Sequence, residues 1–175
     1  LDGLPAYARD RANRFALDGY FDEKGEYHKG ALADAEQEVK DAQKEYDDSR
    51  KRHSAYEPRS GHMNSEERAA KEKLDRALEK YQDLKVIKSR TEPIYRLTNG
   101  LAPATSDFNY DEKYQRPTAI GSAGNPDTAT RVSTLVPGIG TNVRGDLGYY
   151  MDFNDRLRDQ TKHAGVNPNT VATIS

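Results

Sequence analysis

The sequence has no cysteine, no tryptophan and no long apolar run. The absence of cysteine excludes disulfides, thiolate zinc sites and cysteine nucleophiles. No stretch approaches the roughly 18 consecutive apolar residues of a membrane-spanning helix, so we expect no transmembrane segment. Hydrophobic residues make up only 34% of the 175 residues, which is little core material for a globular chain.

An excess of charge of one sign is also missing. The sequence contains 27 Lys and Arg against 29 Asp and Glu, which gives a net charge of -2. Because this balance provides no basic field to hold a phosphate backbone, we expect no nucleic-acid partner. The histidines are scattered and no metal-binding motif accompanies them, so the sequence predicts no metal and no other cofactor. We interpret them as surface or helix-face residues: His28, His53, His62 and His163.

A charged helical hairpin is predicted for residues 27–92. Small and apolar residues recur at alternating spacings of three and four on both sides of the sequence EPRSGHMN, which is typical of two amphipathic helices joined by a turn. Asn64 followed by Glu67 indicates a capping box that opens the second helix, and Pro93 should end it. We expect the two helices to be antiparallel.

Three further segments surround the hairpin. Residues 1–26 carry Pro5 at a plausible first helical position and Gly19 as a stop, which predicts a short N-terminal helical segment. Residues 93–117 lack a sustained period and contain turn formers, so we interpret them as an irregular linker. Residues 118–175 differ in composition, because they contain β-branched and glycine-rich stretches.

The elements predicted within residues 118–175 are strand, loop, helix and strand. A β-branched strand over residues 132–136 is followed at once by a glycine loop, and a second strand is predicted over residues 171–174. Two strands joined by a helix in this way are expected to be parallel, which makes the fold class α/β. The amphipathic stripe expected for the helix consists of Leu147, Tyr150, Phe153 and Leu157.

The glycine loop, residues 137–142 (PGIGTN), is the most informative stretch. Glycines at the carboxyl end of a parallel strand let backbone N–H groups turn toward a bound anion, as in an oxyanion hole. The loop lacks the Lys-Ser/Thr ending of a P-loop and the third spaced glycine of a dinucleotide fingerprint, which argues against phosphate or nucleotide binding. The structural alternative is a tight turn that needs a positive φ.

Two sequence blocks resemble a bacterial alpha/beta-hydrolase family known chiefly as a domain of unknown function: LDGLPAYARDRANR near the start and GNPDTATRVSTLVPGIGTN in the last third. In that family the first block closes a helical N-terminal region, and the second opens the catalytic domain. The resemblance implies an incomplete alpha/beta-hydrolase parallel sheet preceded by an antiparallel α-helical hairpin. It also implies a soluble bacterial protein, and the compartment stays open between secreted and cytoplasmic.

The activity implied by this resemblance is that of a serine hydrolase, esterase-like or lipase-like. In such enzymes the loop after the third core strand supplies an oxyanion-hole N–H group. Gly138, Ile139 and Gly140 occupy that loop here, and the side chain of Asn142 or Thr141 is a further candidate donor.

A pair of tyrosines in the helix after the loop forms a second set of candidates. Tyr149 and Tyr150 are placed to line a pocket for an acyl chain, although at most one of them should face a substrate. The alternative role for both is that of amphipathic packing residues whose hydroxyl reaches water.

No G-x-S-x-G nucleophile elbow occurs in the sequence, so no catalytic triad is assigned. We expect the nucleophile downstream of Ser175, in the remainder of the hydrolase domain or in a complementing chain, and a small acyl substrate. Because the chain starts at Leu1 rather than Met, we expect it to begin inside a longer chain or after processing. The alternative is a non-catalytic interaction or structural protein in which the helical hairpin is the working part.

Overall fold

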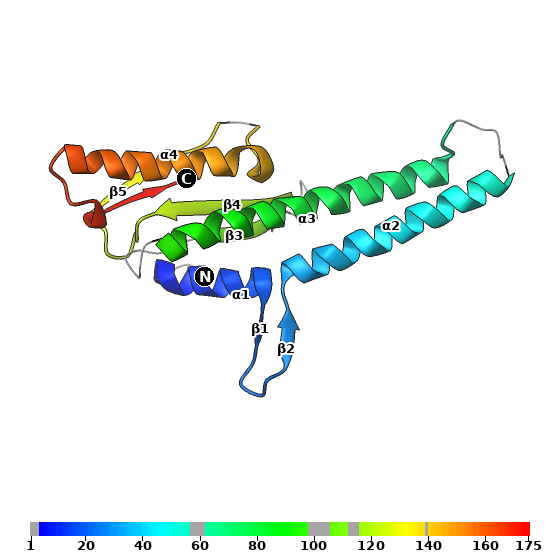
Figure 1. The fold of residues 1–175 in the computed structure, drawn as a ribbon, viewed down its shortest axis with the longest axis horizontal. Helices are drawn as coiled ribbons and strands as arrows, with labels where there is room; N and C mark the ends of the chain where they lie inside the picture. The colour runs from blue at the N-terminus through cyan, green and yellow to red at the C-terminus, as the bar shows by residue number, and fades with distance from the viewer. Residues whose placement is uncertain (1–3, 57–61, 98–105, 112–115, 139) are drawn as a thin grey trace.

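A long helical hairpin lies beside a small mixed sheet (Figure 1). The first helix, α1 (Ala6–Asp18), leads into a short antiparallel pair, β1 (Gly19–Phe21) and β2 (Tyr27–Lys29). The predicted N-terminal helix is thus confirmed. The computed structural model describes residues 4–56, 62–97, 106–111, 116–138 and 140–175.

The β1–β2 pair was not expected from the sequence. Its turn is organised by Asp22, whose Oδ1 accepts hydrogen bonds from Lys24 N at 2.9 Å and from Glu26 N at 2.8 Å. Gly25 adopts a φ of 77°, the left-handed conformation that favours glycine. The strands hold only three residues each, too few for an alternating pattern to stand out.

Two antiparallel helices, α2 (Ala31–Tyr56) and α3 (Ser65–Leu97), form the predicted hairpin. The expected cap is present, because Asn64 Oδ1 accepts a hydrogen bond from Glu67 N at 2.8 Å. The Glu67 carboxylate reaches His53 on the other helix, with 2.7 Å between its Oε2 and His53 Nδ1. Small residues on the predicted stripe of α2 are buried and let the helices approach closely: Ala35, Ala42 and Ser49.

The predicted end of the second helix at Pro93 is wrong, because α3 continues to Leu97. Proline lacks the N–H group that would bond to the residue four positions earlier. The residues after the proline keep their own N–H groups, so a helix can continue past it.

The sheet is built from four strands in the order β3, β4, β6, β5. Neighbours β3 (Ser106–Asp111) and β4 (Arg116–Ala123) are antiparallel, and so are β4 and β6 (Val171–Ile174). The strand β5 (Arg131–Thr134) runs parallel to β6, with α4 (Val143–His163) and the short 3-10 helix η1 (Pro168–Thr170) between them in the chain. The predicted parallel pair with a crossover helix is therefore confirmed, within a sheet that is mixed.

The strand β3 falls inside the segment expected to be irregular, residues 93–117. Its sequence, SDFNYD, alternates apolar and polar residues over only a few positions, and its pairing with β4 runs from Ser106↔Gly121 to Asp111↔Arg116. Pairing with a neighbour, rather than the pattern of the strand alone, stabilises it.

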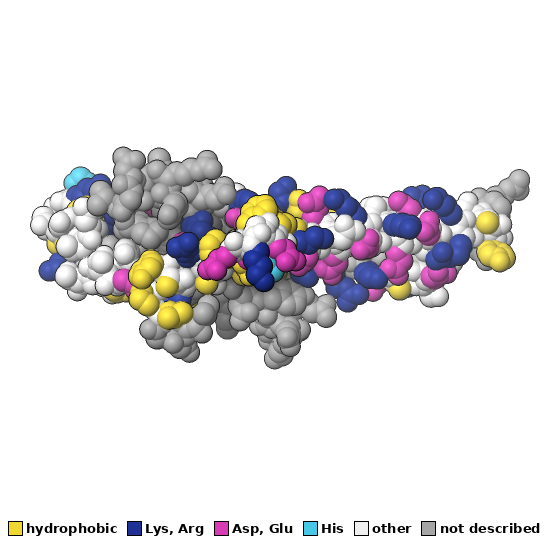
Figure 2. All heavy atoms as spheres, turned by 90° about the horizontal axis from the view of Figure 1, so that it is seen from below, with side chains coloured by type: hydrophobic (Ala, Val, Ile, Leu, Met, Phe, Trp, Pro, Cys, Tyr) yellow, Lys and Arg dark blue, Asp and Glu magenta, His cyan; other side chains and the backbone are white. Residues whose placement is uncertain are grey.

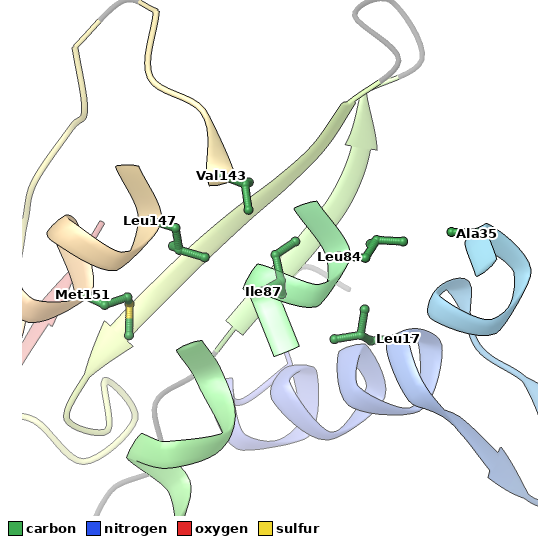
Figure 3. Packing of buried hydrophobic residues seen from close by; sticks show 7 residues of the cluster. All are labelled: Leu17, Ala35, Leu84, Ile87, Val143, Leu147 and Met151. Atoms are coloured by element: carbon green, nitrogen blue, oxygen red, sulfur yellow. The ribbon is translucent and has the colours of Figure 1, made fainter. Parts of the chain in front are cut away.

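One hydrophobic core joins the helical hairpin to the sheet (Figure 3). Leu84 and Ile87 of α3 lie between α1 and α2 on one side and α4 on the other. The buried members of this core are Leu17, Ala35, Leu84, Ile87, Val143, Leu147 and Met151. A second, smaller cluster of Ala42, Leu74 and Ala77 holds the hairpin together farther from the sheet.

The helix α4 buries a face that differs from the predicted one. Leu147 is buried as expected, but Leu157 is 39% exposed, and the buried face consists of Val143, Leu147, Met151 and Asn154. Gly121 of β4 makes room for this face, since a Cβ atom there would lie 2.0 Å from Met151 Sδ. The absence of a side chain at Gly121 therefore lets the face of α4 that carries Met151 pack against the sheet.

The opposite face of the sheet is only partly covered by the described residues. Side chains alternate along a strand, so Ile120 points away from Met151 and α4. Ile120 is 50% exposed and Val132 on β5 is 52% exposed. Because these two large apolar side chains are about half exposed, this face has the character of a packing surface.

Positive and negative side chains alternate along the surface of the hairpin (Figure 2). Several of them pair between the two helices, such as Lys80 with Glu38 at 2.7 Å. None of the helices in the described ranges combines the length and apolarity needed to cross a membrane.

Two carboxyl groups on α4 are expected to give opposite pH dependences. Burial raises the pKa of the Asp155 carboxyl, whereas the hydrogen bond from Lys162 lowers the pKa of the exposed Asp159 carboxyl. A raised pKa in the folded state means that stability falls as the pH rises through it, and a lowered pKa means the reverse. Asp155→Asn should gain stability relative to the parent protein as the pH rises above the ordinary value of 3.8, whereas Asp159→Asn should lose stability relative to it as the pH rises toward 3.8.

Urea unfolding of both variants between pH 3 and 7 measures this difference, with Asp159→Asn as the control for Asp155→Asn. Equal pH profiles for the two variants would show that the environments of the two carboxyl groups do not differ in this way.

Candidate functional site

The glycine loop joins β5 to α4 at the carboxyl end of the parallel strand pair. Leu135 N donates to Ile174 O at 2.7 Å, which carries the pairing of β5 with β6 to the start of the loop. Thr141 folds back onto the loop, with its Oγ1 donating to Gly138 O at 3.1 Å. Open α/β sheets bind ligands at this end, outside the carboxyl ends of their strands.

The two described glycines of the loop are exposed and unobstructed. Gly140 has a φ of 92°, and a Cβ atom on Gly138 or Gly140 would meet nothing within 4 Å. Within the part of the chain that the structure describes, the backbone N–H groups of both glycines form no hydrogen bond. Ile139 lies outside the described residues. The loop thus presents two donors of the kind that an oxyanion hole uses.

Asn142 serves as the N-cap of α4. Its Oδ1 accepts a hydrogen bond from Gly145 N at 2.8 Å, and its own N–H group donates to Asp146 Oδ2 at 2.8 Å. This reciprocal pair fixes the angle at which the loop enters the helix. The carboxamide oxygen of Asn142 is therefore committed to the cap, while its Nδ2 group keeps its two donors.

A pocket of about 170 Å³ lies between the glycine loop, α4 and the sheet. Gly138 and Gly140 do not line this pocket, although they are flanked in sequence by loop residues that do. Apolar side chains from β4 and α4 form part of the wall, and hydroxyl groups form another part. The lining residues are Pro117, Thr118, Ala119, Pro137, Thr141, Asn142, Val143, Asp146, Leu147, Tyr150 and Ser175.

The structure separates the two candidate tyrosines. Tyr150 lines the pocket, while Tyr149 is 60% exposed and does not. The rings of Tyr149 and Tyr150 meet edge to face with 5.4 Å between their centroids, and Tyr149 also stacks on Phe153. Of the pair, only Tyr150 is placed to contact a ligand in the pocket.

No cationic side chain lines the pocket among the described residues; Asp146 is the charged residue of the wall. The positive end of the α4 dipole lies at the pocket, because Val143 begins that helix. The histidines lie elsewhere. His163 ends the 21-residue helix α4, about 30 Å from its first turn at 1.5 Å per residue.

A cluster that the sequence reasoning missed lies on the β1–β2 hairpin. The ligand atoms of Asp22, Glu26 and His28 all come within 4.8 Å of one another. Backbone hydrogen bonds, first of all from Glu26 N, lower the pKa of the Asp22 carboxyl, and the ring of His28 stacks on Tyr20. Within this cluster His28 Nε2 lies 3.3 Å from Asp22 Oδ2, and all three residues lie on a different element from the pocket.

The remaining pocket residues carry no motif from which they could have been predicted. Ser175 and Ala119 reach the pocket only because β6 and β4 pair, and the pairing joins positions more than 50 residues apart. No spacing rule covers such a distance.

In the last third of the chain, a strand, a loop and a helix precede the second strand of a parallel pair. Residues 112–175 match the alpha/beta hydrolase family model. The match covers β4, β5, α4 and β6, including the glycine loop and the whole pocket wall. It does not include the N-terminal block or the helical hairpin. No curated protein and no solved structure shows significant similarity to the chain.

Proposed function

We propose that this chain contributes the oxyanion hole and part of the substrate pocket to a serine hydrolase that cleaves small esters, thioesters or amides. The observation that carries the proposal is the pair of unbonded N–H groups at Gly138 and Gly140, in the loop that borders the pocket. The alpha/beta hydrolase match over residues 112–175 supports it.

The position of the loop also supports this role. In the order of the chain, β5 is the third strand of the four-stranded sheet, and α4 is the helix that follows it. Alpha/beta hydrolases take one oxyanion-hole N–H group from the loop between these two elements. The N–H groups would stabilise the negative oxygen of the tetrahedral intermediate, since they are fixed donors that need no reorganisation during the reaction.

A nucleophile must come from outside residues 1–175 in this proposal, because they contain no G-x-S-x-G elbow. We place it in the remainder of the same hydrolase domain or in a complementing chain. The half-exposed Ile120 and Val132 on the partly covered face of the sheet are consistent with a surface that such a segment would cover.

Labelling of the protein from its natural source with a serine-reactive phosphonate tests the proposal. We expect a labelled polypeptide that is heavier than 19.6 kDa, or a labelled partner that separates on denaturation, with the label outside residues 1–175. Denaturing mass spectrometry locates the label, and heat-inactivated protein is the control. A species of 19.6 kDa without label would contradict the proposal and favour the helical hairpin as an interaction module.

A further inference from the structure

A buried asparagine lies next to the pocket, at the end of the otherwise apolar buried face of α4. Asn154 is fully buried on α4, one turn beyond Met151. Its Nδ2 group donates a hydrogen bond to Ser175 Oγ at 2.8 Å, and its backbone oxygen accepts one from Thr173 Oγ1 at 3.0 Å. The side chain therefore bridges α4 and the end of β6.

The other side-chain atom of Asn154 has no partner. Asn154 Oδ1 is buried and accepts no hydrogen bond among the described residues. A half-satisfied amide in a core is less favourable than an apolar side chain of similar size, so packing alone does not account for it. What the amide provides is the N–H group that it directs to Ser175.

This hydrogen bond determines what the serine hydroxyl can do. A hydroxyl that accepts through its oxygen keeps its own proton for donation. Within the described ranges that proton has no acceptor, and Ser175 lines the pocket together with Tyr150 and Asn142. Backbone hydrogen bonds in both directions with Gly121, of 2.8 and 2.9 Å, hold Ser175 in place on the sheet.

We propose that Ser175 is a substrate-contacting residue that donates a hydrogen bond to an uncharged oxygen of the acyl substrate, and that Asn154 is the positioning residue that orients it. This inference rests on the proposed hydrolase function. The ligand is an uncharged acyl group, because the wall offers donors and apolar side chains but no cation from the described residues.

The test measures kcat and KM of the intact natural protein with p-nitrophenyl butyrate. Ser175→Ala should raise KM about 3- to 10-fold, the worth of one net hydrogen bond, and leave kcat within about twofold. Ser175→Thr restores the hydroxyl and should recover most of the affinity. Ser133→Ala, on the exposed part of β5 away from the pocket, is the matched control and should change neither constant.

Two substitutions at Asn154 separate positioning from packing. Asn154→Asp keeps the shape of the side chain but replaces the donor by an acceptor. The Ser175 hydroxyl would then donate its proton to the carboxylate instead of to the substrate, so KM should rise as in Ser175→Ala. Asn154→Leu removes the orphaned oxygen and should also raise KM, even if its unfolding temperature is unchanged or higher. A purely structural Asn154 would shift the unfolding temperature of both variants without changing KM.

Failure of this inference and failure of the proposed hydrolase function would give different results. An active parent protein whose KM is unchanged in Ser175→Ala would overturn this inference and leave the hydrolase function standing. A parent protein with no esterase activity and no phosphonate label would overturn the hydrolase function, and this inference with it.

Discussion

In the proposed hydrolase, replacement of Gly138 by valine is expected to lower kcat by about 10²- to 10³-fold, which corresponds to roughly 2.7–4 kcal/mol of lost transition-state stabilisation. The β-branched side chain would occupy the open space beside the loop N–H groups and keep the substrate oxygen away from them. Folding should be unaffected, because a Cβ atom on Gly138 meets nothing within 4 Å. Steady-state kinetics and thermal unfolding of the same samples measure both effects.

Two further variants make the Gly138 experiment specific. Gly138→Ala adds less bulk and should give an intermediate loss of kcat. Ser133→Val places the same kind of side chain on the exposed strand before the loop, and it should leave kcat unchanged. If Gly138→Val turned over substrate at the parent rate, the loop would have no part in the mechanism.

Gly124→Ala is expected to destabilise the fold by about 2–5 kcal/mol. Gly124 has a φ of 91°, which costs a residue with a side chain about 1–2 kcal/mol. A Cβ atom there would also lie 2.4 Å from Val171 O, and overpacking against a backbone that cannot move aside adds about 1–3 kcal/mol. Gly124 directly follows β4, and Val171 is the first residue of β6.

Gly25→Ala is the matched control for Gly124. Gly25 also has a positive φ, of 77°, but a Cβ atom there meets nothing within 4 Å. It should therefore show only the conformational cost, about 1–2 kcal/mol. Urea unfolding of the intact protein gives both values, and equal losses for the two variants would show that the approach to Val171 is not tight.

The elements that the sequence predicted well are those with a long period or a strong local signal. The helical hairpin repeats its spacing over many turns, and Asn64 caps the second helix as expected. The order of strand, glycine loop, helix and strand followed from the β-branched residues and the turn formers. Each of these signals lies within one stretch of chain, so no knowledge of tertiary packing is needed.

The errors occur where packing overrides local pattern. Gly121 leaves room on the sheet for Met151 of α4. Asn154 is also buried, although a polar residue would not be assigned to a buried face from the sequence. The short strand β3 exists through its pairing with β4. Both outcomes depend on residues distant in sequence, which single-sequence patterns do not capture.

The candidate site divides in the same way. The glycine loop was found from its composition, and Asn142 and Tyr150 from their position after it. Ser175 and Asn154 belong to no motif. Their candidate role follows only from the structure, in which a buried amide donates a hydrogen bond to a hydroxyl group of the pocket.

The shared core gives the helical hairpin a mechanical connection to the pocket. Val143 and Leu147 are wall residues of the pocket and also core residues packed with Leu84 and Ile87 of α3. The hairpin, about 39 Å long from the 26 residues of α2, is therefore attached to the pocket wall through this core. Removal of the hairpin would leave Val143 and Leu147 without their packing partners Leu84 and Ile87.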